Sequence, residues 1–124
     1  MCKVKMFKIE QKFNGTEDLY RYLLKNVEFI GKSIGVQIQK PLKDNPFCIT
    51  GKEKITERNI LFFASKSEFP ENLGELIALA GAFEIDIIVY FVQKKCGKTH
   101  METLNWLQKI CNEDTQFIVS EADF

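Results

Sequence analysis

The chain has no closely spaced cysteine pair, no long apolar run and only three prolines. Its cysteines, Cys2, Cys48, Cys96 and Cys111, form neither a CxxC motif nor a zinc-binding spacing. We therefore expect reduced thiols in a reducing compartment. The longest clean apolar run, Ile87 to Val92, is far too short to span a bilayer, and the first residues lack the apolar stretch of a signal peptide. These absences predict a cytoplasmic protein without a membrane segment.

Length and composition predict one globular domain over residues 1–124. The chain has 124 residues, 45% of them hydrophobic, with eleven Phe. A chain of this size buries roughly two-thirds of the surface that it exposes when unfolded. That is enough for a core without disulfide or metal staples.

Charge is unevenly distributed along the chain, although the formal net charge is zero. Residues 1–58 contain twelve Lys and Arg against seven Asp and Glu, and residues 59–124 contain five against ten. The asymmetry is consistent with a basic face for an anionic partner, with self-association of opposite poles, or with ordinary solvated surface lysines.

The stretch from Arg58 to Val92 organises the fold. The apolar runs Ile60–Ala64 and Ile85–Val92 predict strands over Ile60–Ser65 and Ile85–Gln93. Between them, a segment that begins at Pro70 has helical spacing. This pattern predicts a parallel strand pair with a crossover helix, and the lack of alternation in the first run predicts an interior strand. Small residues such as Gly74 and Gly81 predict that the helix packs closely against the sheet.

The flanking segments predict further elements. Thr16 is expected to be a helix N-cap, and Gly31 and Gly35 to end that helix. That helix is expected to run from Glu17 to about Val27 or beyond. Strands are expected over Met6–Ile9, over Val36–Gln39, which Pro41 ends, and over Phe47–Thr50, which Gly51 ends. A last helix is expected from Lys98 or Thr99 to about Cys111, followed by a short strand over Phe117–Val119. This order favours an α/β fold with a mixed central sheet flanked by helices.

Packing motifs in the second half carry a resemblance to a known superfamily. They are Leu73-Gly74 with Leu76-Ile77, Ala80-Gly81-Ala82, the Ile87–Tyr90 strand, and His100, Leu104 and Trp106-Leu107 in an H-x-x-x-L-x-W-L pattern. With these motifs the chain resembles an uncharacterised prokaryotic domain family of the restriction-endonuclease-like, or PD-(D/E)XK nuclease, superfamily. The resemblance covers about residues 58–120.

The resemblance implies a site on two adjacent strands, where two carboxylates hold Mg²⁺ and a lysine assists the attacking water. The D/E-x-K triplet falls on Ala64-Ser65-Lys66, so the lysine is present and the acid is alanine. The earlier acid falls on Cys48-Ile49. The resemblance therefore implies a degenerate nuclease fold without a metal cofactor.

Two functional interpretations follow from this pattern. In the first, the domain is catalytically inactive and binds nucleic acid or a protein partner. In the second, it is an active Mg²⁺-dependent endonuclease with Lys66 and relocated acids such as Asp44 and Glu68. A structural homodimer is a third possibility.

Six basic residues are candidates for contact with the phosphates of DNA or RNA: Lys52, Lys54, Arg58, Lys94, Lys95 and Lys98. Solvated turns explain them about as well. The lone histidine, His100, is expected to bond backbone at a helix start, and Trp106 to anchor a helix on the sheet.

Overall fold

The computed structural model describes residues 4–45, 48–64, 73–93 and 115–124. Its elements are β1 (Val4–Lys12), α1 (Thr16–Lys25), α2 (Val27–Ile34), β2 (Ile38–Asp44), β3 (Ile49–Glu53), β4 (Asn59–Ala64), α3 (Leu73–Ala82), β5 (Ile87–Gln93) and β6 (Gln116–Asp123). None of the described helices is long and apolar enough to cross a membrane.

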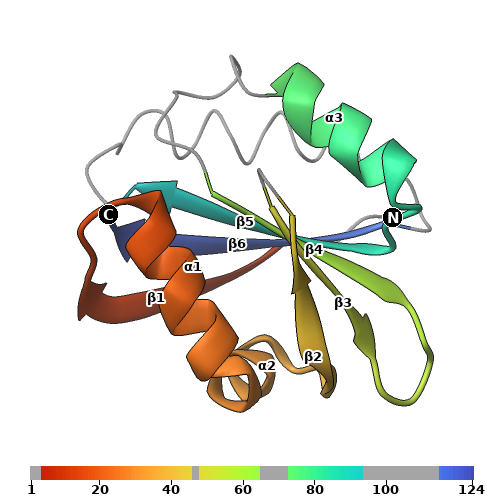
Figure 1. The fold of residues 1–124 in the computed structure, drawn as a ribbon, viewed down its shortest axis with the longest axis horizontal. Coiled ribbons are helices and arrows are strands. Elements are labelled where there is room, and N and C mark those ends of the chain that lie inside the picture. Colours follow the sequence, from red (N-terminus) through yellow and green to blue (C-terminus); the bar gives the residue numbers. More distant parts are fainter. Residues whose placement is uncertain (1–3, 46–47, 65–72, 94–114) are drawn as a thin grey trace.

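The six strands form one mixed sheet in the order β1-β6-β5-β4-β3-β2. Strands β1, β6, β5 and β4 are parallel to one another, whereas β3 and β2 continue the sheet by antiparallel pairing. Helices α1 and α2 cover one face and α3 covers the other (Figure 1). This arrangement confirms the α/β class, the mixed sheet and the parallel β4–β5 pair joined through α3.

Strand β4 is interior, as its apolar run predicts, because it pairs with β3 on one side and β5 on the other. Its side chains alternate between two cores. Ile60, Phe62 and Ala64 belong to the core under α1 and α2. Leu61 and Phe63 belong to the core under α3. All five are at most 6% exposed.

The predicted first helix is in fact two helices. The chain breaks at Asn26, whose backbone N–H and side-chain amide both donate to the Tyr22 carbonyl at 2.9 Å and so cap the end of α1. The N-cap is Gly15, not Thr16, because Gly15 takes the positive φ of 106° and Thr16 is already helical. In addition, the backbone N–H of Asn14 donates to Asp18 Oδ2 at 2.9 Å.

Gly31 lies inside α2 and does not end it; Gly35 does, with a φ of 79°. A Cβ at Gly31 would lie 2.6 Å from the Val36 carbonyl oxygen, on backbone that cannot easily move. Gly31 therefore allows α2 to approach the chain that enters β2.

Two strands extend beyond the residues that were expected to end them. Strand β2 runs through Pro41, whose peptide bond with Lys40 is cis. A proline fits there because β2 is an edge strand whose register on β3 is irregular between Gln39 and Lys43. Strand β3 runs through Gly51, over which Leu42 of β2 packs closely enough that a Cβ would overlap it.

Strand β6 is eight residues long, longer than the predicted Phe117–Val119, because it pairs on both sides with β1 and β5. The close packing expected of the glycines in α3 is wrong for Gly81, which is exposed and has no described atom within 4 Å of an added Cβ. The packing predicted for Gly74 is not tested by the described residues. The helix expected over residues 98–111 lies outside them.

The two helical glycines predict opposite responses to alanine. Gly31→Ala should lower the free energy of unfolding by roughly 1–3 kcal/mol, since the methyl group meets fixed backbone. Gly81→Ala should raise it by about 0.5 kcal/mol, since the methyl group meets no described atom and the unfolded chain loses freedom. Urea unfolding of the two variants and the parent measures both, and equal stability of the Gly31 variant would contradict this account of α2.

Candidate functional site

The residues that the resemblance equates with metal-binding acids are buried in apolar cores. Ala64 ends β4 at 6% exposure, and Cys48 and Ile49 are fully buried where β3 begins. Ile49 and Ala64 share the core under α1, whereas Cys48 belongs to the core under α3. Because carboxylates are absent from all three positions, the described part of β3 and β4 offers no metal ligand there.

The carboxyl end of β4 is held by a tyrosine from α1. The Ala64 amide donates to Tyr20 Oη at 2.8 Å, and the same hydroxyl donates to the Ala64 carbonyl at 3.3 Å. The described register of β3 on β4 begins at Ile49, opposite Phe62. The Tyr20 hydroxyl therefore satisfies backbone groups beyond the described end of the β3 ladder and holds the last residue of β4.

A hollow of about 560 Å³ lies beside this tyrosine. We call it the α1 hollow, and its described lining is Glu17, Tyr20, Arg21, Leu24, Asp44 and Asn45. Two carboxylates and one guanidinium thus face a common space near the end of β4. Asp44 reaches it from β2, where it pairs with Ile49.

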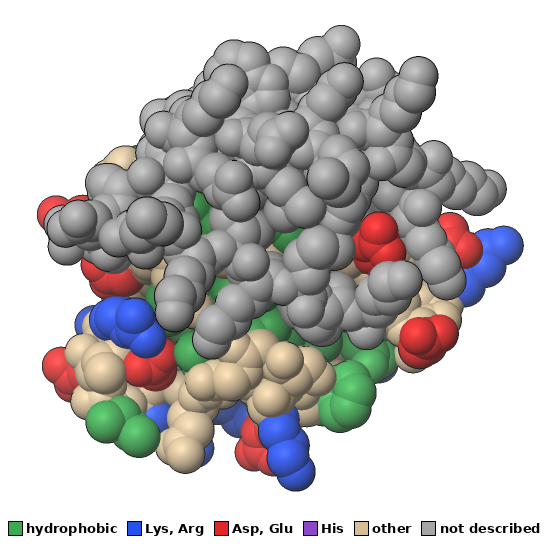
Figure 2. Space-filling model, turned by 180° about the vertical axis from the view of Figure 1, so that it is seen from behind, with side chains coloured by type: hydrophobic (Ala, Val, Ile, Leu, Met, Phe, Trp, Pro, Cys, Tyr) green, Lys and Arg blue, Asp and Glu red, His purple; other side chains and the backbone are tan. Residues whose placement is uncertain are grey.

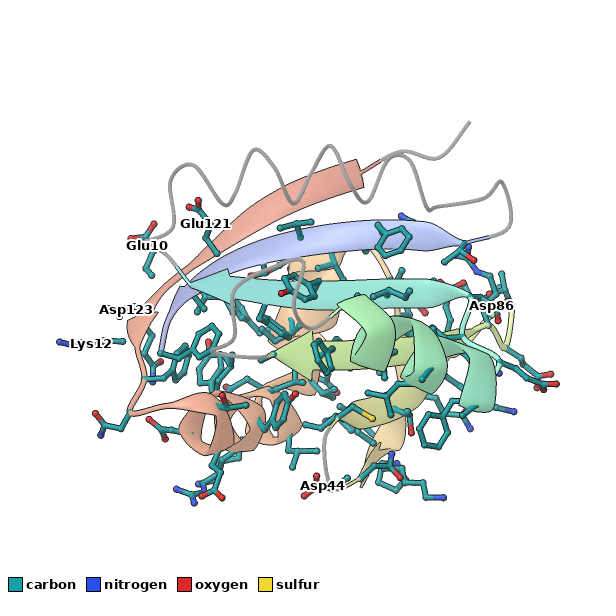
Figure 3. The ribbon with its side chains drawn as sticks, turned by 90° about the horizontal axis from the view of Figure 1, so that it is seen from above. Glu10, Lys12, Asp44, Asp86, Glu121 and Asp123 are labelled. Atoms are coloured by element: carbon teal, nitrogen blue, oxygen red, sulfur yellow. The ribbon has the colours of Figure 1, made fainter. Side chains whose placement is uncertain are left out.

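Asp44 lines the α1 hollow together with Glu17, and it lies apart from the other acids labelled in Figure 3. Glu10, Glu121 and Asp123 lie together toward the carboxyl ends of β1 and β6, away from Asp44. Among residues 4–45, 48–64, 73–93 and 115–124, no group of three or more His, Cys, Asp or Glu could hold a metal ion. Lys66 and Glu68 lie outside the described residues, so the relocated-acid constellation is represented by Asp44 alone.

The predicted phosphate-contact residues do not form one described surface. Lys52 lines a hollow of about 350 Å³ between β2, β3 and the end of α3. Lys54 lines another, of about 380 Å³, with Glu28 and Lys32 of α2. Lys94, Lys95 and Lys98 lie outside the described residues, as do His100 and Trp106.

Arg58 is engaged within the β3–β4 hairpin. Its Nη2 lies 2.9 Å from Glu53 Oε2, and Thr56 Oγ1 donates to the other oxygen of the same carboxylate. The Glu53 side chain is 9% exposed and that of Arg58 is 41% exposed. This ion pair closes the turn, at which Glu57 takes a left-handed φ of 59°. A phosphate contact by Arg58 would therefore compete with Glu53.

Burial alone would raise the pKa of Glu53, but the hydrogen bonds from Thr56 and Arg58 outweigh it and the pKa is lowered. A lowered folded-state pKa means that the carboxylate stabilises the fold above the ordinary Glu pKa, and that this contribution is lost as pH falls through the folded value.

We therefore expect the unfolding temperature to fall on acidification below the ordinary Glu pKa of 4.5. Glu53→Gln should be less stable at neutral pH and should lose less stability than the parent over the same acid range. Thermal unfolding across this pH range measures the difference. Parallel pH profiles for parent and variant would contradict the role assigned to the Glu53 carboxylate.

No family model, curated protein or solved structure matches this chain.

The sequence motifs did not reveal the four residues of the α1 hollow that come from α1, which are Glu17, Tyr20, Arg21 and Leu24. Glu17 was visible only as a first-turn acid, and Tyr20 and Arg21 had no motif around them. The signal for Tyr20 was its position one turn after that acid, on the side of α1 that meets the sheet.

Proposed function

We propose that this chain is a nuclease-like domain that binds nucleic acid without cutting it. The observation that carries the proposal is the hollow at Lys52. Its described lining combines lysine, amide and hydroxyl groups with an aromatic ring and contains no carboxylate. Such a set suits a phosphate and its attached nucleotide better than it suits a metal ion.

The absence of cleavage is supported by the side chains at the two strand positions where acids would be needed. Ala64 and Ile49 are apolar members of one core. Placing a carboxylate at either position would bury a charge unless a cation or hydrogen bonds compensated it. The order of elements from α1 to β5, with a mixed sheet and helices on both faces, supports the resemblance to the restriction-endonuclease-like fold.

The described surface supports local contact with few phosphates. On the face shown in Figure 2, Lys and Arg side chains lie beside Asp and Glu side chains and do not form a uniformly basic field. Because each neutralised phosphate releases counterions, even a few contacts make binding salt-dependent.

Binding to labelled single-stranded and duplex oligonucleotides should appear at low salt and weaken as salt rises. A plot of log K against log salt should have a slope of roughly −0.7 for each phosphate contacted on a single strand. Fluorescence anisotropy measures both quantities. Absence of binding at low salt, or a flat salt dependence, would overturn the proposal and favour a protein partner.

A second candidate function is metal-dependent cleavage with relocated acids. The observation that favours it is the pair Glu17 and Asp44 at one hollow near the end of β4. Carboxylate oxygens at this hollow are ligands that Mg²⁺ accepts, and Lys66 follows β4 by two residues.

Incubation of DNA and RNA, single-stranded and duplex, with the protein and Mg²⁺ or Mn²⁺ separates the two candidates. We expect no cleavage. Cleavage that Lys66→Ala and Asp44→Asn both abolish, and that Lys54→Ala leaves intact, would replace the first proposal with the second. Cleavage that persists in the Lys66 and Asp44 variants would identify a contaminating nuclease and leave the first proposal standing.

A further inference from the structure

A row of three polar side chains crosses the sheet in register on the α3 side. Gln39 of β2 pairs with Lys52 of β3, and Lys52 pairs with Asn59 of β4. Directly opposed residues project from the same face of a sheet, with Cβ atoms about 5 Å apart. Asn59 and Leu61 are two residues apart in β4, so their side chains point to the same face of the sheet. Leu61 belongs to the core under α3, so the row lies on the α3 face.

This row forms one wall of the hollow at Lys52, which we call the β2–β3 hollow. Its described lining is Gln39, Lys40, Pro41, Thr50, Gly51, Lys52, Asn59, Phe83 and Ile85. The polar groups come from the strands, and the apolar groups come from Pro41 and from the chain that leaves α3. The hollow therefore has a hydrogen-bonding side and an apolar side.

Both walls are held by hydrogen bonds within the fold. The backbone N–H of Asn59 donates to Asp86 Oδ2 at 2.9 Å, and the side-chain Nδ2 of Asn59 donates to the Glu84 carbonyl at 3.1 Å. The Ile85 amide donates to the Ala80 carbonyl at 2.9 Å, which closes the end of α3 just after Phe83. The hollow is thus pre-organised, which lowers the entropy cost of filling it.

Lys52 is the cation in this hollow that is available for a ligand. Lys40, the other lysine in the lining, lies 3.1 Å from Glu28 Oε1 on α2. Lys52 is exposed, and among the described residues it has no ion-pair partner. An anion placed over β3 would meet the Lys52 ammonium with the Gln39 and Thr50 side chains beside it.

We propose that the β2–β3 hollow binds one nucleotide of a single strand, with its phosphate at Lys52 and its base against Phe83. This inference rests on the proposed function and names its substrate class. An unpaired base offers a π-face to an aromatic side chain, whereas bases within a duplex are stacked on their neighbours. Phe83 is partly exposed, lines the hollow and packs against the core under α3.

The test compares variants of the full chain in binding to a short labelled single strand and to the matching duplex, as DNA and as RNA. Phe83→Leu should weaken single-strand binding by about tenfold, because the π-face is lost while apolar volume remains. Phe83→Tyr keeps the ring and should bind as the parent does. Unfolding curves for both variants establish that α3 still packs.

The lysine pair supplies the matched control. Lys52→Ala should lower affinity and reduce the steepness of the single-strand salt slope by about 0.7. Lys54 has the same charge two residues away and lines a different hollow, so Lys54→Ala should leave both quantities unchanged.

The outcomes separate this inference from the proposed function. If the parent binds with a salt slope but Phe83→Leu has no effect, or Lys54→Ala weakens binding as much as Lys52→Ala does, the nucleotide site is overturned and nucleic-acid binding stands. Duplex binding at least as tight as single-strand binding would also overturn the site. If the parent binds no oligonucleotide, both proposals fail together.

Discussion

The burial of β4 on both faces is the constraint on which the rest of the structure depends. Its five apolar side chains from Ile60 to Ala64 divide between two cores, so both faces of the sheet must be covered at this strand. Helices α1 and α2 cover one face and α3 the other (Figure 1). Burying a side chain of this size contributes about 1.5–3 kcal/mol, so a polar substitution within this strand would disturb two cores at once.

The same burial explains the location of the polar features. With apolar side chains from Ile60 to Ala64, polar groups gather at the two ends of β4. At its carboxyl end, Tyr20 bonds both backbone groups of Ala64 and leaves the α1 hollow beside it. At its amino end, Asn59 bonds Asp86 and Glu84 and forms part of the β2–β3 hollow. Each hollow therefore lies at one end of a strand that is buried on both faces.

The sequence alone could predict the elements that have a strong apolar pattern. Strands β4 and β5 and the helix between them follow from uninterrupted apolar runs and helical spacing. The errors arise where tertiary context overrides a local breaker. Pro41 does not stop β2, because an edge strand tolerates a missing N–H. Gly31 does not stop α2, because it is the residue without a Cβ where the helix meets Val36.

The candidate sites were harder to predict, because they depend on register and not on motifs. Gln39, Lys52 and Asn59 are thirteen and seven residues apart in sequence, and only the pairing of β2, β3 and β4 places them in one row. Lys52 and Lys54 looked equivalent as members of one charged segment. The end of β3 at Glu53 separates them, since Lys54 belongs to the turn and lines the hollow with α2.

The two hollows lie at opposite ends of β4 and differ in the chemistry of their linings. The α1 hollow contains Glu17 and Asp44, whose negative charge repels a phosphate unless a cation or Arg21 offsets it. The described lining of the β2–β3 hollow has no such charge. In the proposed function, a single strand would therefore bind at the amino end of β4, where the described lining carries Lys52 and no carboxylate.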